Sequence, residues 1–243
     1  MGYINTSAAS GVCRIELNRP DCGNLVTSTM VVELTEHLRS VAADVKLIVI
    51  SGQGQDFCKG RDYQTAPESA GAGKSAPSAL TIREQMTAPM TTLYSTLRDA
   101  PVPTLSVVQG AAYGFGCALA GACDMTIAAD TARFRLPEMG RGLPPTLAMT
   151  ALWDRVTPRA IGYMVYSTAE LTAVDASRID LVHAVVPAAE LPAHTTALVE
   201  TICKQPLDAI RSVKEYLRVA PSMPAIARGG LGASLFAGVL SSR

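Results

Sequence analysis

The sequence of 243 residues has few of the residue types that build metal centres, disulfide frameworks or nucleic-acid interfaces. It contains three histidines and six cysteines, and no two cysteines form a C-x-x-C pair. Scattered in this way, these residues predict neither a zinc site nor a disulfide scaffold, so we expect no metal and reduced thiols. The 21 basic residues are balanced by 21 acidic ones, which argues against a nucleic-acid partner.

Long apolar runs are also missing. No run is long enough to span a bilayer, and the first residues lack the pattern of a secretory signal peptide. We therefore expect a cytoplasmic protein without a membrane partner. Apolar residues still make up 48% of the chain, which suits one large domain, with or without a small appendage.

Apolar segments of two kinds alternate through the first two thirds of the chain. Buried strands are expected at Val12–Leu17, Lys46–Ser51, Thr104–Gln109 and Met125–Ala129, and helices at Ser28–Ala43 and Ile82–Leu97. This alternation predicts parallel strands with right-handed crossovers, and the pattern becomes mostly helical from Leu147. The class is therefore α/β with a C-terminal α region. The small, polar segment Ala66–Ala79 is expected to act as a mobile lid or linker.

The stretch "GAAYGFGCALAGACD", Gly110–Asp124, contains four glycines and five alanines. It joins an expected strand to a helix that begins near Gly114. The N–H groups of a first helical turn carry partial positive charge, and glycine lets another molecule approach them closely. Such a helix start can stabilise an oxygen that becomes anionic during a reaction. Close packing is the ordinary alternative for small residues at such a junction.

Two further loops complete a possible site. "DFCKGRD", Asp56–Asp62, also follows a buried strand and also contains a glycine. This loop and the Gly110–Asp124 stretch could each supply one N–H to a shared oxygen. In "ARFRLPEMGRGLPP", Ala132–Pro145, Glu138 follows a proline and could move a proton. Taken alone, Glu138 could equally be a solvated surface residue.

With all three loops in this order, the chain resembles the crotonase family, also called the enoyl-CoA hydratase/isomerase family. The motifs that carry the resemblance are "IELNRPDCGN", "LIVISGQGQDFCKGRD", "VVQGAAYGFGCALAGACDMTIAADTARFRLPEMGRGLPP" and "LVHAVVP". They extend over roughly Val12 to Lys214. The resemblance implies a ββα spiral core over residues 1–190 and a C-terminal helical trimerisation region over 191–243. It also implies an acyl-CoA substrate, no separate cofactor, and a homotrimer or dimer of trimers.

The resemblance further implies an oxyanion hole made by the backbone N–H groups of Arg61 and Phe115. Hydratases of the family use two glutamates, of which one matches Glu138, whereas the other position holds Ala118. A methyl group cannot exchange a proton, so the sequence favours a Δ3–Δ2 enoyl-CoA isomerase that uses Glu138 alone.

Three alternatives remain open. The first is a hydratase with an atypical second acid, for which Glu84, Asp62 or Asp154 would be the substitute. The second is a single-glutamate enzyme that forms carbon–carbon bonds or decarboxylates its substrate. The third belongs to another class, a catalytically degenerate protein that only binds acyl-CoA.

Other residues have subsidiary roles in this interpretation. Candidates for the substrate pocket are Gly114, Ala118, Tyr113, Glu84 and Thr146, and Tyr94 could also donate a hydrogen bond there. Candidates for binding the CoA phosphates are Lys59, Arg61, Lys214 and, in the same region, Arg218. We interpret His183 and the thiol of Cys117 as structural.

Overall fold

The computed structural model describes residues 2–62 and 78–242. Of the segment Ala66–Ala79, which the sequence suggests is a lid, residues 66–77 lie outside the described part. Within that part, no helix is both long and apolar enough to cross a membrane.

A six-stranded sheet forms the centre of the molecule, with the strand order β1-β2-β3-β4-β6-β9. Its strands are β1 (Ile4–Ala9), β2 (Val12–Leu17), β3 (Leu47–Gly52), β4 (Thr104–Val108), β6 (Met125–Ala129) and β9 (Ala184–Val186). The pair β1–β2 is antiparallel, and every later pair is parallel. The four strands expected from the sequence, which correspond to β2, β3, β4 and β6, occur within one residue of their predicted bounds.

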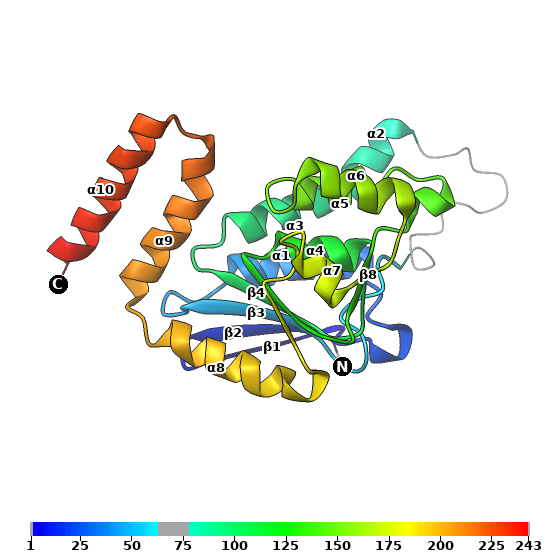
Figure 1. Cartoon of the computed structure of the whole chain (residues 1–243), viewed down its shortest axis with the longest axis horizontal. Coiled ribbons are helices and arrows are strands. Elements are labelled where there is room, and N and C mark those ends of the chain that lie inside the picture. Colours follow the sequence, from blue (N-terminus) through cyan, green and yellow to red (C-terminus); the bar gives the residue numbers. More distant parts are fainter. Residues whose placement is uncertain (1, 63–77, 243) are drawn as a thin grey trace.

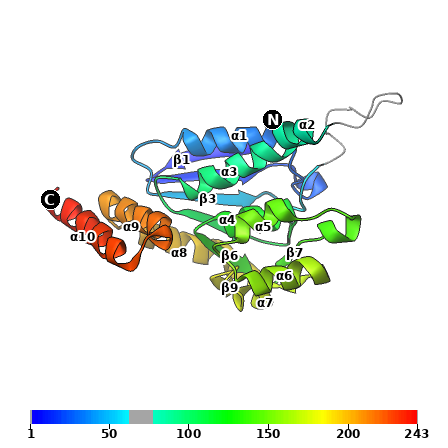
Figure 2. The same cartoon turned by 90° about the horizontal axis from the view of Figure 1, so that it is seen from above.

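The central strands β3, β4 and β6 are buried on both faces, which explains why they are continuous apolar runs, whereas the edge strand β1 is mostly exposed. Along β3, Ile48 and Ile50 join the larger core, whereas Leu47 and Val49 join a smaller core that includes residues of α8 (Leu191–Cys203). On the larger core's side lie α1 (Ser28–Arg39), α3 (Ala88–Arg98), α4 (Phe115–Ala122) and α5 (Thr146–Leu152). Figure 2 shows α1 and α3 side by side over the sheet.

Some helix bounds differ from the prediction. The first helix ends at Arg39, before the expected Ala43, and Ser40 caps it. The helix expected at Ile82–Leu97 is compound: α2 (Ala79–Ile82) and α3 are joined by one turn of π-helix, Arg83–Thr87.

A second, three-stranded sheet lies beside the first and contains β5 (Ala111–Tyr113), β7 (Arg133–Arg135) and β8 (Leu171–Thr172). The strand β5 is absent from the sequence-based expectation, which runs the glycine stretch directly into a helix. Two of its three residues are alanine, which is depleted in strands. Pairing with β7, together with a bridge from Ala112 to Cys58, makes it a strand.

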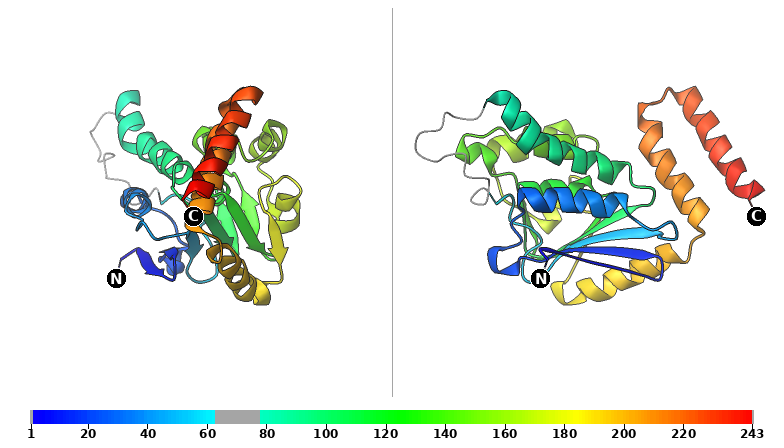
Figure 3. Two further views of the ribbon diagram at one scale, coloured as in Figure 1. Left: turned by 90° about the vertical axis from the view of Figure 1, so that its left-hand side faces the viewer. Right: turned by 180° about the vertical axis from the view of Figure 1, so that it is seen from behind.

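The last two helices project from one end of the molecule, and buried residues of the first of them, Ile210 and Lys214, attach it to the rest. Figures 1 and 3 show α9 (Leu207–Val219) and α10 (Ala225–Ser241) as a hairpin that projects from the sheet and its covering helices. α6 (Pro158–Ser167) and α7 (Ala173–Ser177) complete the helices. Because α8 still packs on the sheet, the projecting part begins later than the predicted division at residue 191. That division into two regions stays a prediction.

Candidate active site

The two loops that the sequence suggests supply N–H groups are in direct contact. The amide of Cys58 donates to the Ala111 carbonyl, and the Tyr113 amide donates to the Cys58 carbonyl, both at 2.9 Å. The Cys58 carbonyl oxygen lies so close to Gly116 that a Cβ there would be 2.1 Å from it. Glycine is therefore required at 116 for the Asp56–Asp62 loop to reach the start of α4.

Arg61 is held by a bridge to the segment before α1. The Val26 amide donates to the Gly60 carbonyl and the Asp62 amide donates to the Val26 carbonyl, each at 2.9 Å. In such parallel pairing the bonds come from residues 60 and 62, so the Arg61 N–H is directed away from Val26. The Arg61 guanidinium donates to the Thr27 carbonyl and the Ser28 hydroxyl, which braces the loop on the start of α1.

Phe115 is the first residue of α4, and Gly114 precedes it with φ 51° and ψ −113°. Only glycine adopts such a conformation readily. The first N–H groups of a helix have no acceptor within the helix, and they carry its positive dipole end. The Phe115 amide is therefore suited to an oxygen that gains negative charge.

Glu138 is positioned at the start of this helix by a tight turn. Pro137 precedes a 3-10 turn, Glu138–Arg141, which begins with the glutamate itself. A Cβ on Gly114 would lie 2.6 Å from Glu138 Oε1, so the carboxylate occupies the space that a side chain at 114 would fill. Burial raises the pKa of Glu138 above its ordinary value, against smaller lowering effects of its own amide and of Arg141. A raised pKa makes this carboxylate a stronger base than that of an exposed glutamate.

An apolar wall surrounds the start of α4. The rings of Tyr94, from α3, and Phe115 stack with centroids 6.2 Å apart. Cys117 and Ala118 are fully buried. Burial, with the nearby Glu138 charge, raises the pKa of the Cys117 thiol to about 12, which makes it a poor nucleophile. Its structural interpretation is consistent with this setting.

Several other candidates lie in different surroundings. Tyr113 donates its hydroxyl to Glu170 at 2.6 Å, so that group is engaged at the second sheet. Thr146 is exposed and lines a cavity with Arg98 and Trp153 rather than with Glu138. Glu84 is exposed in the π-helical turn, so its position gives no support to a role as second acid.

The remaining acidic candidates form ion pairs. Asp62 is 9% exposed and pairs with Arg19 at 3.0 Å, which suits a residue that braces its loop and not one that transfers a proton. Asp154 pairs with Arg98 at 2.5 Å and not with Arg155, its neighbour in the sequence.

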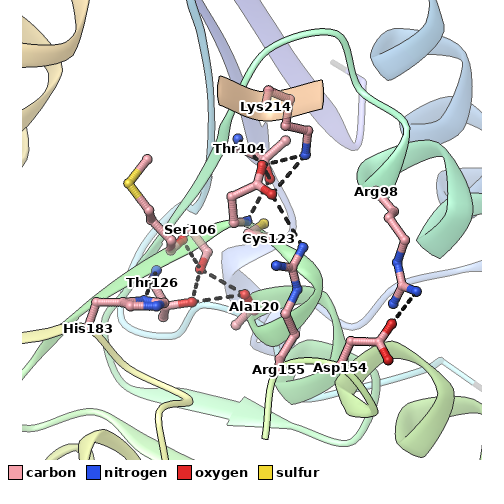
Figure 4. Close-up of polar contacts among 12 residues, drawn as sticks. Arg98, Thr104, Ser106, Ala120, Cys123, Thr126, Asp154, Arg155, His183 and Lys214 are labelled. Carbon is pink, nitrogen blue, oxygen red and sulfur yellow. Dashed lines mark hydrogen bonds and ion pairs between the residues drawn. The ribbon is translucent and has the colours of Figure 1, made fainter. Parts of the chain in front are cut away.

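The expectation that Lys214 binds a CoA phosphate needs correction. Lys214 is only 5% exposed, and its ammonium donates to both carboxylate oxygens of Asp124, at 2.8 and 2.7 Å. Figure 4 shows this pair with Arg155 and Thr104 on the same carboxylate. Lys214 therefore fastens α9 to the end of α4, opposite the end where Phe115 and Glu138 lie.

Two other basic residues and one histidine have clear partners. Lys59 pairs with Asp56 at 2.8 Å, with its side chain half-exposed. Arg218 makes hydrogen bonds to Glu215 on its own helix. The Thr126 amide donates to Nδ1 of His183 at 3.0 Å, a structural contact that Figure 4 also shows. Among residues 2–62 and 78–242, no three histidine, cysteine or acidic side chains form a group suited to a metal ion.

Comparison with known proteins shows which family this sequence matches. The sequence model of a family described as enoyl-CoA hydratase/isomerase matches residues 7–242. A probable enoyl-CoA hydratase from Rhodobacter capsulatus is 30% identical over 234 residues, which are 96% of this chain and 87% of that protein.

Solved structures are similar over nearly the whole chain. That of an enoyl-CoA hydratase from Mycobacterium smegmatis has a TM-score of 0.90 at 23% identity, covering 99% of this chain and 91% of that one. At this identity the likeness concerns the fold alone. A putative enoyl-CoA hydratase from Thermobifida fusca, in complex with acetoacetyl-CoA, has a TM-score of 0.89 at 27% identity, covering 99% and 96% of the two chains.

Proposed function

The chain belongs to the enoyl-CoA hydratase/isomerase family, and from this premise we propose that it moves a double bond in an acyl-CoA thioester, with Glu138 as its single catalytic carboxylate. The CoA thioester is the substrate and not a resident cofactor. The Thermobifida fusca neighbour, whose structure contains acetoacetyl-CoA, supports a ligand of this class.

The proposed reaction has three parts. The backbone N–H groups of Arg61 and Phe115 donate to the thioester oxygen. Glu138 then takes a proton from the α-carbon of a 3-enoyl thioester, and the electrons move into a dienolate whose negative oxygen the two amides stabilise. Finally, Glu138 returns the proton to the γ-carbon, which leaves a 2-enoyl thioester and restores the carboxylate.

The observation that carries this proposal is the contact between Glu138 Oε1 and Gly114. It places a carboxylate with a raised pKa next to Gly114, and the following residue, Phe115, begins α4. A protein that only binds acyl-CoA needs no partly desolvated carboxylate at this point. The contact therefore favours an enzyme over the degenerate binding protein.

Hydration of a 2-enoyl thioester is the second candidate, because the relative from Rhodobacter capsulatus is named as a probable hydratase. The buried methyl group of Ala118 argues against the route that needs two carboxylates. Neither Glu84 nor Asp62 stands in surroundings that favour it as the replacement.

For the rest of the CoA molecule, we propose Lys59 as a cation that meets a phosphate. Its side chain is half-exposed, and in the Asp56–Asp62 loop it comes directly after the buried Cys58. We do not propose Lys214 as a phosphate-binding residue, since its charge is buried against Asp124.

We also propose that the α9–α10 hairpin packs against further copies of the chain in a trimer-based assembly. Large apolar side chains on it are exposed: Ile226 is 90%, Phe236 68% and Leu217 62% exposed, and the last two line the groove between α9 and α10. Exposed apolar surface of this extent is characteristic of protein interfaces.

The test removes one amide without removing the helix. Proline is tolerated at the first helical position but has no N–H. Phe115→Pro should therefore lower the kcat of double-bond migration about 10²–10³-fold relative to Phe115→Ala, which keeps the amide. Equal rates in the two variants, with equal thermal unfolding, would refute the backbone role.

A further inference from the structure

A cavity of about 340 Å³ lies where α9 joins the rest of the molecule. This volume falls within the range of pockets that hold small molecules, roughly 300–1,000 Å³. Its walls come from α3, from the segments after α4 and α5, and from α9 and the turn after it. The charged side chains in these walls are Arg98, Asp124, Asp154, Arg155, Lys214 and Arg218. Neither Glu138 nor the two loops with the proposed amides contribute, so this cavity is separate from the candidate active site.

Both carboxylates in the walls already have cations. Asp124 accepts hydrogen bonds from the Lys214 ammonium on both of its oxygens, at 2.8 and 2.7 Å. One of these oxygens also accepts from the amide and hydroxyl of Thr104. Asp154 pairs with Arg98 at 2.5 Å. Each carboxylate is therefore compensated before Arg155 is counted.

Arg155 is the cation in these walls with the fewest partners. Arg218, by contrast, bonds to Glu215 at 2.8 Å and also approaches Asp99 at 3.4 Å. Within the described part of the chain, the Arg155 side chain makes one hydrogen bond, from Nη2 to Asp124 at 3.3 Å. Its Nε is buried without a partner among the same residues. An arginine has five N–H donors, and buried donors in proteins are nearly always hydrogen-bonded, so this guanidinium lacks acceptors.

A second arginine borders the same cavity. Figure 4 shows Arg98 and Arg155 extending in opposite directions, the first from α3 and the second from the segment after α5. The side chain of Arg98 is 40% exposed and that of Arg155 is 29% exposed, so both can be reached from the cavity. Arg98 uses only Nη1 for its bond to Asp154. Planar guanidinium groups with free donors bind phosphate by paired hydrogen bonds.

We propose that this cavity binds a phosphate group between the guanidinium groups of Arg155 and Arg98. A phosphate carries about two negative charges and three strong acceptor oxygens, enough for donors from both arginines. The walls also contain Leu217 and Pro221, against which the apolar part of a phosphate ester could lie. Because Leu217 belongs to α9, such a ligand would contact both the core and the projecting hairpin. The inference is independent of the proposed reaction.

The test is calorimetric titration of the full chain with inorganic phosphate and with phenyl phosphate, which carries the same oxyanion on an apolar ring. Ionic strength is held constant with sodium chloride. We expect saturable binding at a single site. Arg155→Gln should weaken it about tenfold or more, because charge-assisted hydrogen bonds to the phosphate are lost. The matched control is Arg159→Gln, an exposed arginine on α6 outside this cavity, which should bind phosphate as the wild type does.

Arg98→Gln tests the opposite wall. Its partner Asp154 has a side chain that is 55% exposed, so loss of this ion pair should change stability little. Binding should weaken in this variant as well. Thermal unfolding in phosphate-free buffer shows that each variant is folded, and Arg98→Gln keeps the test valid if Arg155→Gln is not.

The two probes separate the sources of the phosphate group. Tighter binding of phenyl phosphate would identify a phosphate ester as the ligand, and tighter binding of inorganic phosphate would identify free phosphate. The inference is overturned if neither probe shows saturable binding, or if Arg155→Gln and Arg98→Gln both bind as tightly as the wild type. Equal weakening in Arg159→Gln would also overturn it, since this would indicate a general effect of charge.

Discussion

Glu138 Oε1 lies where the side chain of residue 114 would be, 2.6 Å from a Cβ built on Gly114. The contact joins residues 24 positions apart in the sequence, one at the start of a helix and the other at the start of a 3-10 turn. It explains why residue 114 has no side chain, and the positive φ of 51° is a second, separate reason for glycine at this position.

Substitution of Gly114 should therefore damage the site more than the fold. In Gly114→Ala the new methyl group would meet Glu138 Oε1 and also strain a backbone with φ 51°. We expect a loss of roughly 1–3 kcal/mol in the free energy of unfolding and a much larger proportional loss of migration activity. Chemical denaturation and the 3-enoyl-CoA assay measure the two effects.

The matched control is Gly162→Ala on α6. No atom lies within 4 Å of a Cβ there, and its φ is not in the left-handed region. This variant should be as stable as the wild type or up to about 1 kcal/mol more stable. A fully active Gly114→Ala protein would show that the Glu138 carboxylate works from another position.

The pH dependence of the reaction should follow Glu138. Burial raises its pKa above the ordinary value of 4.5, and the base acts only when ionised. As pH falls, kcat should therefore decrease from a pH above 4.5. An acid limb centred at or below the ordinary value would contradict the buried carboxylate as the base.

Stability should change with pH in the opposite direction. Because the folded protein holds the Glu138 proton more tightly than the unfolded chain, the contribution of this group is favourable below 4.5 and is lost as pH rises through the folded pKa. Glu138→Gln cannot titrate, so its free energy of unfolding should lack this decline. Urea unfolding of both proteins across this pH range measures the difference.

The buried pair of Lys214 and Asp124 should contribute to stability and not to CoA binding. Lys214→Ala leaves Asp124 with Arg155 as its remaining cation at 3.3 Å. We expect a loss of roughly 3 kcal/mol in the free energy of unfolding with little change in KM. In the exposed control Lys204→Ala, the change should stay within about 0.5 kcal/mol. A stable Lys214→Ala protein with a raised KM would restore the CoA-binding role.

A charge at Phe236, which lines the groove between α9 and α10, should disrupt assembly. Phe236 is 68% exposed in the single chain, and burying a glutamate there in an interface would be unfavourable. Phe236→Glu should lower the mass in solution toward the 25.5 kDa of one chain, as measured by light scattering. An unchanged mass, with unchanged helix content, would place the contacts between copies elsewhere.

Much of the fold follows from local patterns in the sequence. Continuous apolar runs such as Leu47–Gly52 indicate strands buried on both faces, and the structure has them at these places. The expected crotonase-like fold is confirmed by neighbours with TM-scores of 0.89 and 0.90. Trimerisation stays a prediction.

The parts that sequence reasoning missed depend on contacts between distant segments. The strand β5 exists because Ala112 meets Cys58 and β7, which no local pattern shows. The sequence does not show that the ammonium of Lys214 pairs with Asp124, which lies 90 residues earlier in the chain. The single charge of the Gly110–Asp124 stretch, at Asp124, is the sequence feature that could have indicated this pair, because a buried carboxylate needs a cationic partner.

The identities of Arg61, Phe115 and Glu138 could be proposed from ordered motifs. The surroundings of these residues could not be predicted, because the burial of the Glu138 carboxylate and the position of the Tyr94 hydroxyl depend on how distant segments pack. Tyr94 illustrates this, since the sequence suggests only that it could reach a pocket. The structure stacks it on Phe115 with an unpartnered oxygen among the described residues.

The most direct test of the account is the rate at which Glu138→Gln converts a 3-enoyl-CoA to a 2-enoyl-CoA. Glutamine keeps the size of the side chain and its contact with Gly114 but cannot accept the α-proton. At saturating substrate we predict a fall in kcat of about 10²–10⁴-fold, with the dissociation constant for CoA thioester little changed. A Glu138→Gln protein with a kcat within a few-fold of the wild type would contradict Glu138 as the proton-transferring group.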